Sequence, residues 1–120
     1  MATINSYRDL QVWQAGRVLV LLVYRTTKTF PAEERFGLTS QMRRAAVSIP
    51  SNIAEGWSRQ HRPEYLQFLR VSRGSLAELE TQVLLSQDLE LMPEATASEL
   101  LSRCDILSRQ LLALERALRR

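Results

Sequence analysis

Apolar residues recur along this chain at steps of three and four, which is the spacing of an amphipathic helix. Four helices are expected, at about residues 9–29, 39–59, 63–90 and 94–118, and no strand pattern competes with them. Pro31 ends the first helix, since the residue before a proline avoids helical conformation, and Pro63 suits the opening turn of the third. Such short connections favour antiparallel neighbours. The sequence therefore predicts one all-α domain over residues 1–120, an antiparallel up-down four-helix bundle.

Each predicted helix carries a stripe of periodic positions that is expected to face the core. In chain order the stripes are Leu10, Trp13, Arg17, Val20 and Tyr24; Met42, Ala46, Ile49, Ile53 and Trp57; Tyr65, Leu69, Ser72, Leu76, Leu79, Val83 and Ser86; and Ala97, Leu100, Cys104, Leu107, Leu111, Leu114 and Leu118. Thr39 or Ser40 is in place to cap the second helix. Thr96 and Glu99 form a capping-box pattern near the start of the fourth.

The first helix also contains an uninterrupted apolar run, from Val18 to Val23, which covers every direction around its axis. A helix that is apolar all round is buried on more than one side. Either its own three neighbours surround it, or one side faces the bundle core and another packs against a second copy of the chain. Trp13 and Trp57 supply large aromatic surfaces of the kind enriched at interfaces. We therefore favour self-association.

The second helix has a proline, Pro50, in its interior, where the ring removes one backbone donor and clashes with the carbonyl four residues earlier. Such a helix needs a bend or a close packing partner, and a proline-bent second helix is predicted. A ridge of small residues along the same helix would let another backbone approach closely; it consists of Ala45, Ser48, Asn52 and Gly56.

Two polar features of this helix are expected to be structural. The amide of Asn52 must find partners if it is buried, so a role in tying the helix to a neighbouring loop is favoured over ligand binding. Glu55 and Arg59 lie one turn apart in the order that suits an intrahelical ion pair. The residues expected to serve structure or assembly are Trp13, Pro50, Asn52, Glu55, Gly56 and Trp57.

Composition narrows the class of protein. Of the 120 residues, 45% are hydrophobic and 24% are charged, which is ordinary for a globular domain. The N-terminal segment has neither the basic start nor the apolar run of a signal peptide. The longest apolar run is far shorter than the ~20 residues of a membrane helix. A cytoplasmic protein without a membrane partner is expected.

Catalytic and metal-binding chemistry finds little support in the sequence. Cys104 is the single cysteine and His61 the single histidine, which excludes an intrachain disulfide and a cysteine- or histidine-rich metal site. His61 falls at the junction of the second and third helices, where a solvated side chain is favoured over a catalytic base. The four glycines are scattered, so they form no phosphate-binding loop. We expect no enzyme activity, no cofactor and no metal.

A family resemblance is carried by three segments: RDLQVWQ at 8–14, FPAEERFGLTSQMRRAAVSIPSNIAEGWSR at 30–59, and EYLQFLRVSRGSLAELETQ at 64–82. With them the chain resembles, from about Tyr7 to Leu118, the four-helix-bundle proteins of 23S ribosomal RNA intervening sequences. The resemblance implies a bundle that assembles as a homopentamer with an open centre. Because that family has no settled biochemical activity, the resemblance implies a fold and an assembly rather than a reaction.

Charge is distributed unevenly along the chain. Residues 1–75 carry 11 basic and 5 acidic side chains, whereas residues 76–120 carry 5 and 8. The candidates for binding RNA or DNA are six arginines of the second and third helices, Arg43, Arg44, Arg59, Arg62, Arg70 and Arg73. No aromatic-rich stacking surface is evident beside them, so the expected binding follows the nucleic-acid backbone rather than the bases.

Two functions of different class are compatible with these residues. The first is an oligomeric scaffold that binds RNA or DNA, in which a pentamer would repeat the basic patch around a ring. The second is an oligomeric protein–protein adaptor, in which the arginines pair with acidic side chains of the third and fourth helices within or between subunits. The partners of the arginines in the folded chain distinguish the two.

Overall fold

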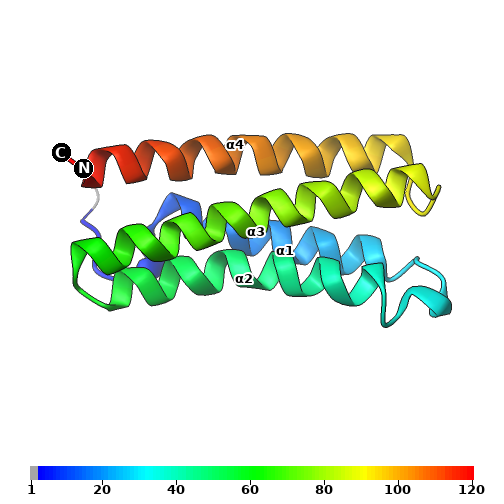
Figure 1. The fold of residues 1–120 in the computed structure, drawn as a ribbon, viewed down its shortest axis with the longest axis horizontal. Coiled ribbons are helices and arrows are strands. Elements are labelled where there is room, and N and C mark those ends of the chain that lie inside the picture. Colours follow the sequence, from blue (N-terminus) through cyan, green and yellow to red (C-terminus); the bar gives the residue numbers. More distant parts are fainter. Residues whose placement is uncertain (1–2) are drawn as a thin grey trace.

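The computed structural model describes residues 3–120, which form four long α-helices and two short 3-10 helices, and no strand occurs among these residues. The elements are η1 (Tyr7–Asp9), α1 (Gln11–Thr27), η2 (Ala32–Glu34), α2 (Leu38–Ser58), α3 (Arg62–Asp88) and α4 (Glu94–Leu118). The long helices lie side by side along the 44 Å axis of a molecule that measures 24 by 21 Å across (Figure 1). The prediction of an all-α protein with four helices is confirmed.

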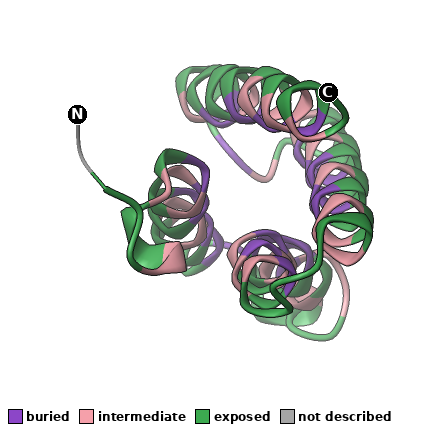
Figure 2. Ribbon diagram, turned by 90° about the vertical axis from the view of Figure 1, so that its left-hand side faces the viewer, coloured by how far each residue is buried: buried purple, intermediate pink, exposed green. Residues whose placement is uncertain are grey.

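The helices form a ring in the order α1, α2, α3, α4, and α4 also contacts α1. Connections between successive helices lie at alternate ends of the molecule in Figure 1. Buried residues line the inward faces of the helices, as the end-on view of Figure 2 shows. Full burial of one leucine or isoleucine side chain stabilises a fold by about 1.5–3 kcal/mol. The apolar centre of the ring is therefore what holds the four helices together.

Most of the predicted stripes of α2 and α3 are buried, and Met42, Ile53 and Leu76 are fully so, but Trp57 and Tyr65 at their ends are only half-buried. Near the end of α4 the pattern departs from the prediction. Leu114 is half-buried there, whereas its neighbour Glu115 is fully buried. A carboxylate therefore occupies the last turn of the core, and a buried carboxylate needs a partner.

The buried face of α1 also differs from the predicted stripe. The residues that it buries are Val12, Gly16, Leu19, Val23 and Thr27. Of the predicted stripe, Arg17 and Tyr24 are exposed and Trp13 is half-buried. Because the apolar run covers every direction around the axis, the spacing alone does not determine which face of α1 is buried. In the structure, Val18 and Leu21 of this run are 41% and 50% exposed. The neighbouring helices of the same chain do not surround α1.

Packing of α1 against α2 explains how Pro50 is accommodated. α2 is continuous from Leu38 to Ser58 with Pro50 inside it. A Cβ atom on Gly16 of α1 would lie 3.4 Å from both Cβ and Cδ of Pro50, so the α1 backbone runs directly over the proline ring. The close packing partner that this proline needs is thus a glycine of α1. The bend stays a prediction.

The ridge of small residues on α2 faces α3. A Cβ atom on Gly56 would lie only 2.7 Å from Cβ of Phe68 and 3.3 Å from the carbonyl oxygen of Tyr65. Ser72 of α3, fully buried, donates a hydrogen bond of 3.0 Å to the carbonyl oxygen of Ile49. The backbones of α2 and α3 therefore approach closely, as the ridge predicts.

Asn52 belongs to a hydrogen-bonded chain on this ridge. Its Nδ2 donates to the carbonyl oxygen of Ser48 at 2.7 Å and to the Ser48 hydroxyl at 2.8 Å. The Ser48 hydroxyl also bonds that of Ser75 on α3, at 2.8 Å. The Asn52 amide is therefore bonded within α2 and linked to α3 through Ser48, rather than to a loop.

Two helix starts differ from the predicted caps. At α2, Glu34 Oε1 accepts a hydrogen bond of 3.2 Å from the backbone nitrogen of Leu38, so a carboxylate from η2 takes the place expected of Thr39 or Ser40. α4 begins at Glu94, two residues before Thr96, and no side chain caps it.

Candidate nucleic-acid interface

The buried carboxylate of Glu115 is bound by arginines of α3. Arg73 contacts it with two nitrogens: Nε donates to Oε2, and Nη2 donates to Oε1 at 3.0 Å. Nε of Arg70 lies 3.9 Å from Oε1. The hydrogen bond to Glu115 raises the pKa of the Arg73 guanidinium. Arg70 and Arg73 thus connect α3 to α4 within one chain.

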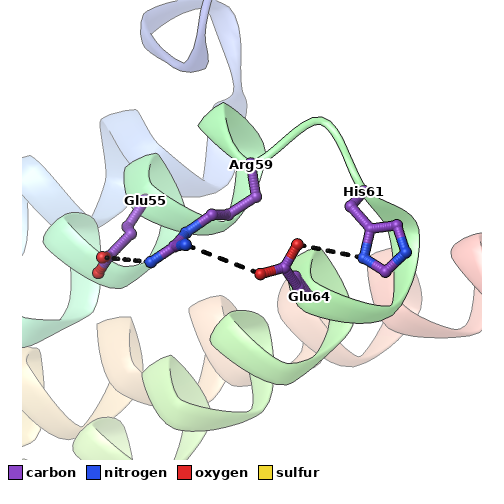
Figure 3. A network of polar contacts seen from close by, with 4 residues as sticks. All are labelled: Glu55, Arg59, His61 and Glu64. Carbon is purple, nitrogen blue, oxygen red and sulfur yellow. Dashed lines mark hydrogen bonds and ion pairs between the residues drawn. The ribbon is translucent and has the colours of Figure 1, made fainter.

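Arg59 and His61 lie at the connection between α2 and α3, beside two glutamates (Figure 3). Arg59 lies 3.3 Å from Glu55 and 3.7 Å from Glu64, whose other oxygen lies 3.2 Å from His61 Nδ1. All four side chains are about half exposed, so these contacts add little stability. The ion pair expected between Glu55 and Arg59 is present. Arg62 is engaged as well, through a hydrogen bond of 3.3 Å to the carbonyl oxygen of Arg120.

The remaining two candidates, Arg43 and Arg44, line an open groove on the outer side of α1 and α2. The groove consists of two hollows, of about 690 and 680 Å³, that share Val47 and Ser51. Tyr7 and Trp13 line the first hollow, and Phe36 lines the second. We call this surface the α1–α2 groove. The six predicted arginines therefore do not form one patch, because four of them contact carboxylates or a carbonyl elsewhere.

Aromatic rings accompany the arginines of the groove, which corrects the expectation that no stacking surface exists. The guanidinium carbons lie above the ring centroids at 5.7 Å in Arg8–Tyr7, 5.6 Å in Arg17–Trp13, 5.4 Å in Arg35–Phe36 and 4.5 Å in Arg43–Tyr24. Each distance lies within the ~6 Å range of a cation–π interaction. A flat cationic group is thus held beside each aromatic surface of the groove.

The charged side chains that line the groove are all basic. Its arginines are Arg8, Arg17, Arg35, Arg43 and Arg44, and no aspartate or glutamate of the described residues lines either hollow. Sequence reasoning missed the first three of these. A signal was present, because Trp13 and Arg17 lie one helical turn apart and the pairs Tyr7–Arg8 and Arg35–Phe36 are adjacent in the chain.

Arg43 is held more firmly than the other groove arginines. Its Nε donates a hydrogen bond of 2.9 Å to the hydroxyl of Thr27, which is itself buried and bonded to the carbonyl oxygen of Val23. The guanidinium therefore spans α1 and α2 while it covers the Tyr24 ring. Trp57, the other predicted interface aromatic, does not line the groove and lies beside Tyr65 and Leu118 near the C-terminal end of α2.

Chemically reactive groups are buried rather than gathered in a site. Burial, with a smaller contribution from the charge of Glu80, raises the pKa of the Cys104 thiol to about 12, so the thiolate is scarce at neutral pH. Burial also raises the pKa of the Tyr65 hydroxyl to about 12. Within residues 3–120, no three His, Cys, Asp or Glu side chains are placed to hold a metal ion. None of the helices described has the length and apolarity needed to cross a membrane.

The fold and its outer surface define a four-helix-bundle protein with a basic, aromatic groove. A family model described as 23S rRNA-intervening sequence protein matches residues 8–113, and the chain belongs to this family. Its fold is similar to that of a Bacteroides thetaiotaomicron protein of unknown function from the S23 ribosomal protein family. The TM-score is 0.81 at 18% identity, over 88% of this chain and 95% of that one, which concerns the fold alone. No curated protein matches the sequence.

Proposed function

We propose that this protein is a non-enzymatic, oligomeric helical-bundle scaffold that binds nucleic acid along the α1–α2 groove. The observation that carries the proposal is the charge of the groove, which five arginines line without an acidic side chain among the described residues. Such a surface attracts phosphates, and each phosphate it neutralises releases counterions into solution. Two of these five arginines, Arg43 and Arg44, are among the six that the sequence predicts to bind nucleic acid. The other three arginines of the proposed site are Arg8, Arg17 and Arg35.

A protein–protein adaptor is the second candidate, and two observations favour it. Phe36 is 88% exposed, and Leu21 and Val47 of the same groove are 50% and 40% exposed. Arginine and aromatic residues are enriched in protein interfaces as well as in nucleic-acid sites. The pairing of Arg73 with Glu115 also follows the pattern expected of an adaptor. The two candidates differ in whether the groove responds to salt as a phosphate site does.

Charge reversal in the groove tests the proposal. Fluorescence anisotropy of labelled RNA and DNA is expected to show an affinity that falls roughly 100-fold between ~50 and ~200 mM salt, if five phosphates are neutralised. Arg35→Glu with Arg44→Glu is expected to lower affinity at ~50 mM salt tenfold or more. The slope of log affinity against log salt concentration is expected to fall by the amount that about 1–2 phosphate contacts contribute. Both side chains are exposed, whereas reversal of Arg43 would also break its bond to Thr27.

The matched control is Arg119→Glu with Arg120→Glu, which changes the net charge equally at two exposed C-terminal positions outside the groove. It is expected to retain most of the affinity. If the control weakens binding as much as the groove variant does, binding reflects overall charge. If the wild-type protein binds neither RNA nor DNA at ~50 mM salt, the nucleic-acid function is wrong and the adaptor is favoured.

We propose that the oligomer, a homopentamer by family resemblance, forms through the outer face of α3. Leu85 of α3 and Leu89, the residue that directly follows the helix, are 46% and 59% exposed and lie four residues apart. Leucines on this face, away from the groove, would be covered in a ring of copies while the groove stayed accessible. Apolar area removed from water contributes about 25 cal/mol per Å², so covering these side chains favours assembly.

Replacing both leucines with glutamate is expected to convert the assembly to monomers, because two charges would be buried without partners. The measurement is the mass in solution by light scattering. Ser98→Glu with Ser102→Glu is the control, since both serines are exposed and polar, lie four residues apart on α4, and receive the same two charges. Unchanged mass in the leucine variant would place the interface elsewhere, and a monomeric wild-type protein would remove the assembly from the proposed function.

A further inference from the structure

We propose that the α1–α2 groove takes single-stranded RNA or DNA, with bases stacked on its aromatic rings, and discriminates against a duplex. This inference rests on the proposed function and specifies the form of nucleic acid that the groove accepts. The geometry that supports it is the repeated juxtaposition of a guanidinium with a ring, at 4.5 to 5.7 Å in four pairs. Each pair therefore places a ring that can stack on a base next to a guanidinium that can bind a phosphate.

The aromatic rings are accessible to a ligand to different degrees. The Phe36 side chain is 88% exposed and that of Tyr24 is 38% exposed. Trp13 is half-buried and packs edge-on against the Tyr7 ring, with centroids 5.3 Å apart. An exposed phenylalanine ring makes no hydrogen bonds to water, whereas a nucleic-acid base can stack its face on the ring and remove both apolar surfaces from water. A guanidinium lies over each ring, and guanidinium planes also stack on bases.

The floor of the first hollow is apolar, and this distinguishes single strands from duplexes. Val47, Pro50 and Ala54 of α2 line it, together with Leu21 of α1. In a duplex the base faces are stacked on one another, so the duplex would present phosphates and sugars to this floor. A single strand can turn its bases towards the rings and the floor while its phosphates meet the arginines. The combination of charge and apolar surface therefore matches unpaired nucleotides.

The groove is long enough for several nucleotides. Trp13 and Tyr24 lie about 16 Å apart along the axis of α1, from eleven residues at 1.5 Å per residue. Phe36 lines the second hollow together with Tyr24, and the two hollows share Val47 and Ser51. Aromatic positions separated in this way suit a strand that follows the groove, since site sizes on other single-strand binders begin at ~4 nucleotides.

The test compares a labelled single-stranded RNA of roughly 20 nucleotides, the same DNA sequence, and the duplex made from that DNA. The single strands are expected to bind at least ~10-fold more tightly than the duplex. Tyr24→Leu and Phe36→Leu are each expected to weaken single-strand binding about fivefold or more without changing its salt dependence, because they remove rings and no charge. Phe68→Leu is the matched control, since Arg59 lies 5.4 Å over the Phe68 ring, outside the groove.

A second readout uses tryptophan fluorescence. The chain has two tryptophans, so Trp57→Phe leaves Trp13 as the reporter. Single-stranded RNA is expected to quench its emission, and duplex DNA is not. If ring variants bind as the wild type does, or if the duplex binds equally well, phosphates alone account for binding; the inference is then wrong while the proposed function stands. If nothing binds and Phe36→Leu lowers the mass in solution, a second copy covers the groove and both are wrong.

Discussion

Arg73→Met is expected to lower the free energy of unfolding by about 3 kcal/mol, because it leaves the carboxylate of Glu115 buried without its main partner. Glu115 is 0% exposed, whereas the Arg73 side chain is 34% exposed. The pair therefore contributes to stability mostly because Arg73 gives the buried Glu115 carboxylate a partner in place of water. Arg70, at 3.9 Å, can replace part of the lost interaction, which places the expected cost at the low end for a broken buried pair.

Two further variants separate this explanation from a general loss of charge. Arg109→Met removes the arginine of an ion pair in which Arg109 and Asp105 are 80% and 57% exposed. It is expected to cost at most about 0.5 kcal/mol. Glu115→Met combined with Arg73→Met removes both charges and is expected to recover most of the loss, since apolar replacement of a whole buried pair is often neutral.

The measurement is urea unfolding followed by circular dichroism, at one fixed protein concentration because assembly would also shift apparent stability. Equal losses in Arg73→Met and Arg109→Met would show that burial of Glu115 does not govern the energetics. A double variant as unstable as Arg73→Met alone would show that the arginine stem, rather than its charge, is what α3 and α4 need.

The burial of Glu115 could not be predicted from the pattern of apolar residues. The three-and-four spacing predicts Leu114 and Leu118 in the core, and a charged residue such as Glu115 is rarely fully buried. The carboxylate can occupy the core only because α3 brings Arg73 beside it, a contact that joins residues 42 positions apart. Local patterns report which residues prefer burial, and they cannot report a partner that only the tertiary fold supplies.

The groove was missed for a related reason. The apolar run in α1 gives the helix no single buried face, and the spacing predicts Trp13, Arg17 and Tyr24 in the core stripe. Once α1 packs its glycine, Gly16, against Pro50, that stripe is displaced onto the outer edge beside α2. The fold class followed from spacing and proline positions, whereas the surface depended on the rotation of one helix.

Gly56→Ala is expected to lower the free energy of unfolding by about 1–2 kcal/mol. Its new Cβ would lie 2.7 Å from Cβ of Phe68 and 3.3 Å from the backbone oxygen of Tyr65. Neither atom can move by rotation of a side chain, so α2 and α3 must separate where they approach most closely. Overpacking of this kind costs about 1–3 kcal/mol, and the better helix propensity of alanine offsets up to about 1 kcal/mol of it.

Gly74→Ala gives the opposite expectation from the same chemical change. Gly74 lies in α3, and a Cβ atom there would meet nothing within 4 Å, so only helix propensity acts and stability should rise by about 0.5–1 kcal/mol. The pair of variants, compared by urea unfolding, isolates the helix contact from the intrinsic preference for alanine. If Gly56→Ala were as stabilising as Gly74→Ala, the backbones of α2 and α3 would have room at Gly56. The small-residue ridge of α2 would then be dispensable for their packing.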